Sequence, residues 1–291
     1  MSLFVSTTFI KDNTSLITAL NILKSINVKS VEIGSNHIFE KNLNYIKRYN
    51  FNYIVHNYFP VPKKPIIVNI SSLDENIRKL SIQHIKKSII FCNNLNAKLY
   101  TFHPGFVKDP IRISNKKNNY DFVWKSGNIN QNLINKAKLH LLNSLDKIIK
   151  FSKKYNVNIA IETEGSYYKN KMLMMQRPEE YDVILSNYSK DDLGINLNIG
   201  HLNLSSKFYN FDKFEFINYI IKYIVAIELS HNNGFEDQHL PLKSNAWYWQ
   251  LIKDKRFKKI IKILEFRNTN ITKLINNIKL FNKKVENHIL V

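Results

Sequence analysis

The stretch "NLINKAKLHLLNSLDKIIKFSKKYNVNIAIE" (132–162) decides the fold, because it joins two different patterns. Residues 132–155 form a long amphipathic segment, as expected of a helix that packs one face against a sheet. Residues 158–162 form a short apolar run that is typical of a buried strand. A helix followed by a buried strand is the repeating unit of a parallel α/β sheet.

The same two patterns alternate along the whole chain, about eight times. We expect strands at 3–7, 30–34, 53–56, 98–103, 158–162, 193–198, 224–230 and 260–266. Further helices are expected at 15–26, 74–95 and 211–223. Eight βα units in 291 residues predict an α/β fold of the (β/α)8 TIM-barrel type, for which about 250 residues is usual.

A doubly wound open sheet is the main alternative architecture. No glycine-rich phosphate-binding turn follows any expected strand, and the chain contains only 7 glycines, so the barrel is favoured. No Pro/Ser-rich linker or charge block divides the chain, and we therefore expect one domain over residues 1–291. The irregular stretch 104–128 follows the fourth strand, on the side where barrels carry their active-site loops.

The formal net charge of +20 raises the hypothesis of a nucleic-acid partner, because basic side chains neutralise phosphates. Nearly all of these cations are Lys, however, and Asn, Ile and Lys are frequent throughout the chain. Arg is the residue that planar recognition of phosphates and bases favours. The charge therefore favours a general compositional bias over a nucleic-acid surface, although a nucleic-acid partner stays open.

The single cysteine, Cys92, excludes a disulfide within the chain, so a reducing cytoplasm is the expected location. The N-terminal "MSLFVSTTFIKDN" has neither a basic start nor a long apolar core. No stretch approaches the roughly 20 apolar residues that span a bilayer. We therefore expect a cytoplasmic protein that does not bind a membrane.

Ionisable side chains gather where the expected strands end. These are His56, His103, Glu162, Asn198 with His201, His231, and Glu265, followed in the loop after His231 by Asp237 and His239. The carboxyl ends of barrel strands converge on one face. Each of these residues alone could be an ordinary polar side chain, but imidazole and carboxylate together are the ligand set of zinc or manganese. The order and number of these residues predict a metal centre.

Seven motifs, in this order, resemble those of the xylose isomerase-like TIM-barrel superfamily. They are "VHNYF" (55–59), "FHPG" (102–105), "IETEG" (161–165), "NLNIGH" (196–201), "SHNNG" (230–234), "DQHLPL" (237–242) and "LEF" (264–266). The resemblance covers residues 3 to 267 approximately. Within this superfamily, the most similar ligand pattern is that of endonuclease IV, a trinuclear zinc enzyme that cuts DNA at abasic sites. Sugar phosphate isomerases and epimerases belong to the same superfamily.

The resemblance implies three metal positions. The first would be held by His56, His103 and bridging Glu162, the second by Glu162, Asn198, His231 and Glu265, and the third by His201, Asp237 and His239. The family has Asp where this chain has Asn198. An amide offers an oxygen but no negative charge, so we expect a weaker second position. One to three ions, zinc or manganese, are expected.

The resemblance leaves the activity open. In a sugar (phosphate) isomerase or epimerase, Glu162 and Glu265 would move a proton next to a carbonyl polarised by the divalent ion. His201 would orient substrate oxygens, Arg267 would hold an anionic substituent, and Tyr58 and Trp124 would exclude water. This first hypothesis implies a carbohydrate substrate and leaves a homo-oligomer open, because dimers and tetramers are common among such enzymes.

Two other hypotheses remain. An endonuclease IV-like zinc phosphodiesterase acting on abasic DNA would use the positive charge for affinity. Asn198 and the glycine-free segment "TTFIKDNTS" (7–15) after the first strand count against it, because the family has a glycine-rich segment there. The other hypothesis is a catalytically altered barrel that binds a small molecule or a protein partner, for which Asn198 is the best argument.

Overall fold

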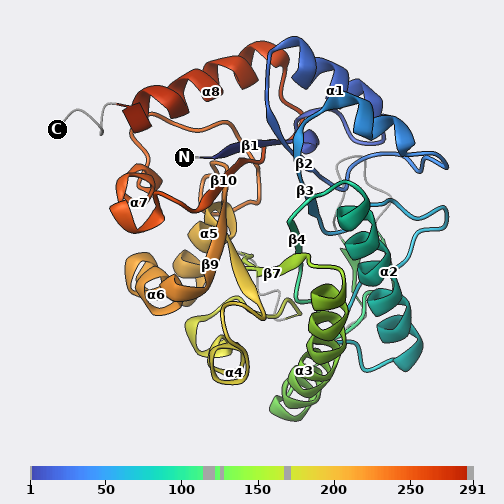
Figure 1. The fold of residues 1–291 in the computed structure, drawn as a ribbon. Coiled ribbons are helices and arrows are strands. Elements are labelled where there is room, and N and C mark those ends of the chain that lie inside the picture. The colour runs from blue at the N-terminus through green and yellow to red at the C-terminus, as the bar shows by residue number, and fades with distance from the viewer. Residues whose placement is uncertain (1, 114–121, 125–127, 167–171, 287–291) are drawn as a thin grey trace.

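Eight parallel strands close into a barrel, which confirms the predicted TIM-barrel fold. The structure, a computed structural model, describes residues 2–113, 122–124, 128–166 and 172–286. The barrel strands are β1 (Leu3–Ser6), β2 (Ser30–Ile33), β3 (Asn52–His56), β4 (Leu99–Phe102), β7 (Asn158–Glu162), β8 (Gly194–Asn198), β9 (Ile224–Leu229) and β10 (Ile261–Leu264). Their order around the barrel is β1-β10-β9-β8-β7-β4-β3-β2, and β1 pairs with both β2 and β10 (Figure 1).

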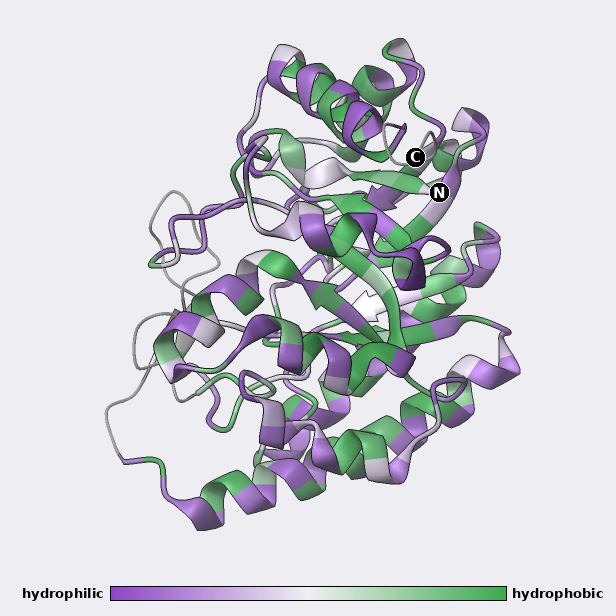
Figure 2. Cartoon of the chain, turned by 90° about the vertical axis from the view of Figure 1, so that its left-hand side faces the viewer, coloured by the Kyte–Doolittle hydropathy of each residue, from purple (hydrophilic) through white to green (hydrophobic). Residues whose placement is uncertain are grey.

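Helices surround the barrel, as Figure 1 shows for α1, α2, α3 and α8. The α-helices are α1 (Leu16–Ser25), α2 (Glu75–Asn94), α3 (Gln131–Lys154), α4 (Asp182–Asn187), α5 (Ile199–Tyr209), α6 (Lys213–Ile220), α7 (Tyr248–Lys253) and α8 (Ile271–Glu286). Short 3-10 helices are η1 (Thr7–Phe9), η2 (Asn44–Tyr49), η3 (Pro178–Glu180), η4 (Ile221–Tyr223) and η5 (Lys255–Phe257). Figure 2 shows hydrophilic and hydrophobic residues along the outer helices, as expected when one face packs on the barrel.

The expected strands agree closely with the observed ones, since only β3 begins before its expected range, by one residue. The loop expected at 104–128 contains a short antiparallel pair, β5 (Arg112–Ile113) and β6 (Phe122–Val123). One correction concerns α5, which starts directly after Asn198 and carries His201 in its first turn. His201 is therefore a helical residue rather than part of a strand end.

The barrel interior has an apolar layer at one level and a polar layer two residues further along each strand. The apolar layer consists of Phe4, Ile54, Leu99, Ala160, Ala226 and Ile263. Because alternate residues of a strand face the same side, the next inward positions are Ser6, His56, Thr101, Glu162, Glu228 and Glu265. All six of these are buried. The barrel interior thus has an apolar layer below a layer of polar and mostly titratable side chains at the carboxyl ends of the strands.

Among the residues that the structure describes, no helix combines the length and the apolar composition needed to span a membrane.

Candidate metal centre

The first group of metal-type side chains is formed by His56, His103 and Glu162. His56 is the last residue of β3, and His103 directly follows β4. Glu162 Oε2 lies 3.6 Å from His56 Nε2 and 3.7 Å from His103 Nδ1. This oxygen is buried and has no hydrogen-bond partner among the described residues. Since one ligand atom from each residue lies within 4.8 Å of the others, the three can hold one ion.

A second group is formed by His201, Asp237 and His239, whose ligand atoms also lie within 4.8 Å of one another. Asp237 Oδ2 is 2.9 Å from His239 Nε2 and 3.5 Å from His201 Nε2. His201 Nδ1 donates to the Thr163 carbonyl at 2.9 Å, which leaves Nε2 free to bind an ion. The Asp237 side chain is 34% exposed, so this group is open to solvent.

Asn198 lies between the buried carboxylates of the site. Its Nδ2 donates to Glu162 Oε1 and Glu228 Oε2, both at 2.9 Å, and to Glu265 Oε2 at 3.5 Å. Its Oδ1 accepts from the backbone N–H groups of Gly200 and His201 at 2.9 and 3.1 Å and thereby caps α5. Backbone N–H groups only donate, so the oxygen must stay on their side. Asn198 consequently offers the carboxylates a donor in place of the expected oxygen ligand.

His231 is the one predicted histidine ligand that the structure does not bring to either group. It follows β9, and its backbone exchanges two hydrogen bonds of 2.8 Å with Leu240. Its ring centroid lies 6.2 Å from that of Tyr248. Glu228 of β9 points into the barrel instead, next to Asn198 in the strand register. The signal for Glu228 is the two-residue period of β9, which places Ala226 and Glu228 on the inner face.

Two further glutamates, which the sequence pattern does not predict, contact members of the site. Glu164 lies two residues after Glu162, just beyond the end of β7, and its Oε1 accepts a hydrogen bond of 2.6 Å from His103 Nδ1. This contact orients the His103 ring. Glu32 of β2 is fully buried and forms a third group with His56 and Glu228, whose ligand atoms lie within 4.8 Å of one another.

Burial and neighbouring charges shift the pKa values of these groups in opposite directions. Burial alone would raise the pKa of Glu162, but His103, His201 and His56 together hold it well below 4.5. Burial would likewise raise the pKa of Glu265, but His239 and Arg267 lower it. Both carboxylates are therefore ionised at neutral pH.

The pKa of Glu228 is raised, first by burial and then by the charges of Glu162 and Glu265. Burial would lower the pKa of His103 and of His239, but nearby carboxylates raise each of them to about 9. At neutral pH the metal-free centre consequently combines ionised Glu162 and Glu265 with protonated His103 and His239, whereas burial disfavours the charged forms of Glu228 and His56 by raising the pKa of the first and lowering the pKa of the second.

The expected substrate-binding residues lie at different places. Arg267 follows β10, its backbone N–H donates to the His239 carbonyl at 3.1 Å, and its charge acts on Glu265. Tyr58 accepts a hydrogen bond of 2.8 Å from the Ile66 N–H and packs against the ring of His84. The ring of Trp124 packs against Phe106, with a centroid distance of 5.1 Å. Of the four expected substrate-binding residues, Arg267 and His201 therefore lie next to the two groups of metal-type side chains.

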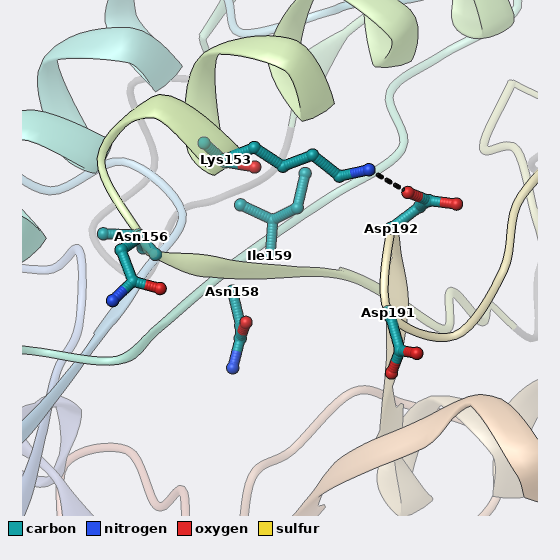
Figure 3. Close-up of a pocket in the computed structure, with 8 residues that line it drawn as sticks. Lys153, Asn156, Asn158, Ile159, Asp191 and Asp192 are labelled. Atoms are coloured by element: carbon teal, nitrogen blue, oxygen red, sulfur yellow. Dashed lines mark hydrogen bonds and ion pairs between the residues drawn. The ribbon is translucent and has the colours of Figure 1, made fainter.

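A hollow at the opposite end of β7 contains none of the predicted site residues. It is lined by residues 152, 153, 156–159, 191 and 192. Figure 3 shows Lys153 reaching toward Asp192, with which it forms an ion pair. Asn158 and Ile159 start β7, whereas Glu162 ends it. This hollow is accordingly separate from the candidate metal centre.

Comparisons with known proteins agree with the fold. The family described as xylose isomerase-like TIM barrel matches residues 21–285. The chain is 30% identical over 288 residues to an uncharacterized protein of Methanocaldococcus jannaschii, covering 96% of this chain and 98% of that protein. It is 25% identical over 242 residues to the apurinic-apyrimidinic endonuclease 1 of Plasmodium falciparum, covering 80% of this chain and 35% of that protein.

Two solved structures show the same fold. A D-tagatose 3-epimerase-like protein has a TM-score of 0.74 and 20% identity, with 100% of both chains covered. The IolI protein with a bound zinc atom has a TM-score of 0.66 and 15% identity, with 99% of both chains covered. The family match and the solved structures therefore agree with the observed TIM-barrel fold.

Proposed function

The chain belongs to the xylose isomerase-like TIM barrel family, and from this premise we propose that it is a divalent-metal-dependent isomerase or epimerase of a carbohydrate. One observation carries the proposal: ionised Glu162 and Glu265 lie beside two groups of metal-type ligands at the carboxyl ends of the barrel strands. The epimerase-like protein among the solved structures supports the same reaction class.

Two groups of residues would hold the metal: His56, His103 and Glu162, and His201, Asp237 and His239. Mixed nitrogen and oxygen ligands suit zinc or manganese, and a zinc atom is present in the IolI structure. One buried atom supports the fit, because Glu162 Oε2 lacks a hydrogen-bond partner within the described part of the chain. A bound ion would supply polarisation of a carbonyl and its neighbouring hydroxyl.

Glu265 is suited to act as the base, because His239 and Arg267 keep it ionised and because it belongs to neither group. It would take the proton from the carbon next to the substrate carbonyl. Because Glu162 is ionised, it would first take a proton from a substrate hydroxyl and then return it to that carbon from another direction, as epimerisation requires a second acid/base group. Asn198 donates to both carboxylates and so fixes their relative position.

Arg267 and His201 would bind the rest of the substrate. The Arg267 guanidinium is close enough to Glu265 and His239 to shift the pKa of both. A planar guanidinium binds phosphate or carboxylate through two parallel hydrogen bonds. This favours a sugar phosphate or sugar acid as substrate over a neutral sugar.

Proton exchange in D2O tests the proposal directly. Purified protein is incubated with manganese or zinc and a panel of ketoses, aldoses and their phosphates, and NMR follows loss of the C–H next to the carbonyl. Exchange should disappear on chelation and fall by about 10²–10⁴-fold in Glu265→Gln, the usual contribution of a general base. If metal-loaded protein exchanges no proton of any sugar in the panel, the proposal is wrong.

A phosphodiesterase acting on abasic DNA is the second candidate. It is favoured by two ligand groups that meet at Glu162, which belongs to the first group and lies 3.1 Å from His201 of the second, because paired ions can stabilise both the attacking and the leaving oxygen of a phosphodiester. The 25% identity to the Plasmodium endonuclease supports it too. Cleavage of an abasic oligonucleotide that stops on chelation, without any sugar exchange, would replace the first proposal with this one.

A further inference from the structure

We propose that Glu32, His56 and Glu228 form an inner divalent-cation site within the barrel, which shares His56 with the first group and is an alternative position to it for one ion. The three residues come from β2, β3 and β9, and one ligand atom of each lies within 4.8 Å of the others. All three are buried, with 0%, 4% and 1% of their surface exposed. The site goes beyond the proposed sugar reaction and does not depend on it.

Glu32 is the member of this group whose carboxylate oxygens have no hydrogen-bond partner among the described residues. Its side chain is completely buried. Buried carboxylates in native proteins are normally paired, hydrogen-bonded or bound to a metal. Glu162 and Glu265 each have histidine partners, whereas none of the described ion pairs involves Glu32. A cation between Glu32 and Glu228 would supply the missing partner.

Glu228 is held in position from the opposite side of the cluster. Asn196 Nδ2 donates to its Oε1 at 2.6 Å, and Asn198 Nδ2 donates to its Oε2 at 2.9 Å. Each carboxylate oxygen can still bind a cation, because it has a second lone pair. The two amides therefore orient Glu228 in the way that outer hydrogen bonds commonly orient metal ligands.

His56 supplies the nitrogen ligand. Its Nδ1 lies 3.7 Å from Glu228 Oε1, a separation that suits two ligands each about 2.0–2.2 Å from one ion. Thr101 Oγ1, which is 2.8 Å from this nitrogen, would have to give way to the ion. Two carboxylates and one imidazole suit zinc or manganese, and they balance the charge of one divalent ion.

His56 also belongs to the first group, but through its other nitrogen, because Nε2 faces Glu162 at 3.6 Å. A neutral imidazole has only one nitrogen free to bind a metal. The inner site and the group formed by His56, His103 and Glu162 are therefore alternative positions for one ion. Removal of His103 should leave the inner position as the only one available to that ion.

Metal counting in full-length variants tests the site, with zinc or manganese as the probe. The variant His103→Ala/Asp237→Ala loses one ligand from each of the other two groups and should still bind about one ion per chain. Adding Glu32→Gln should reduce this to none. No ion in the double variant, or an ion that survives Glu32→Gln, overturns the proposal.

Thermal unfolding separates a ligand from a merely structural residue. In EDTA, Glu32→Gln should not lower the melting temperature, because burial and the neighbouring carboxylates already disfavour an ionised Glu32 when no metal is bound. In the His103→Ala/Asp237→Ala background, it should abolish the rise in melting temperature that added metal causes. Glu180→Gln, a change at a buried glutamate outside all three groups, should leave that rise intact. A lower melting temperature for Glu32→Gln in EDTA would contradict the proposal.

Discussion

Asn198 and Glu162 are joined by a hydrogen bond of 2.9 Å from the amide Nδ2 to the carboxylate Oε1. The amide cannot turn its oxygen toward Glu162, because that oxygen caps α5 through Gly200 and His201. The position that the sequence predicts as a weak metal ligand therefore presents a hydrogen-bond donor. In this way the metal-free barrel brings Glu162, Glu228 and Glu265 together around one uncharged group.

Replacement of Asn198 by Asp should separate these two roles. One carboxylate oxygen would keep the helix cap, and the other would face Glu162, Glu228 and Glu265. Loss of the donor and gain of a buried charge should destabilise the protein in EDTA by about 3–5 kcal/mol, as measured by denaturant unfolding. In the presence of zinc or manganese, the variant should bind about one more ion than the natural sequence.

Asn196→Asp is the matched control for this change. Asn196 also donates to Glu228, at 2.6 Å, but it caps no helix. The Asn196→Asp change should destabilise the protein in EDTA without adding a bound ion. An unchanged metal content in Asn198→Asp would show that residue 198 does not face a metal position.

A second prediction concerns Gly165, which lies against the first turn of α5. A Cβ atom at this position would be 1.9 Å from the backbone oxygen of His201. Since backbone cannot move aside as a side chain can, Gly165→Ala should shift α5 and cost about 1–3 kcal/mol of unfolding free energy. The shift should also weaken metal binding at His201 by about 10–100-fold.

Gly200→Ala provides the comparison, because its Cβ would first meet the Ser230 hydroxyl at 2.9 Å. A side-chain hydroxyl can rotate away, so this variant should lose less stability than Gly165→Ala. Equal losses in calorimetry and in metal titrations would contradict the explanation based on backbone contact.

The barrel could be predicted from sequence because its strands are short apolar runs separated by long amphipathic helices. The members of the first group, His56, His103 and Glu162, could be proposed as ligands from sequence because each stands at or directly after the end of such a run. Glu32 is harder to identify, because it is one of several charged residues near strands and its burial depends on contacts across the barrel. Sequence alone does not show which strand ends meet in space.

Glu228 and Asn198 show the physical limit of the prediction. Residue type favours His231 as a metal ligand, but the inward face of β9 includes Ala226 and Glu228, and His231 lies beyond the strand. The orientation of Asn198 depends on where α5 begins, because only the N–H groups of a helical first turn fix the amide oxygen. Both outcomes follow from strand register and helix boundaries, which sequence patterns define least accurately.

The stability of the metal-free protein should fall in mildly acidic solution because of His37. Burial lowers the pKa of this histidine from 6.5 to about 4. Its Nδ1 lies 3.1 Å from the Thr14 carbonyl, and its Nε2 lies 2.8 Å from Thr7 Oγ1. Because its folded pKa is below the unfolded value, the unfolded chain takes up the proton first as the pH falls. Its contribution is therefore complete above pH 6.5 and is lost as the pH falls to about 4.

The loss expected from His37 is about 3 kcal/mol at most. Urea unfolding in EDTA between pH 7 and about pH 4 should show it as a steeper decline for the natural sequence than for His37→Gln. Parallel curves for the two proteins would contradict the role given to His37, because all other titrating groups are the same.

Arg267 should influence both substrate choice and the acidity of the proposed base. Its positive charge lowers the pKa of Glu265, so Arg267→Gln should raise that pKa and move the acid limb of the exchange reaction to higher pH. Arg267→Lys keeps the charge and should retain the limb near its original position. Lysine lacks the planar guanidinium that forms two parallel hydrogen bonds, however. Arg267→Lys should therefore raise the KM for a sugar phosphate by about tenfold or more, while the KM for the matching neutral sugar changes little. pH–rate profiles with both sugars measure these effects separately. Equal shifts of the acid limb in the Lys and Gln variants would show that the charge of Arg267 does not control Glu265.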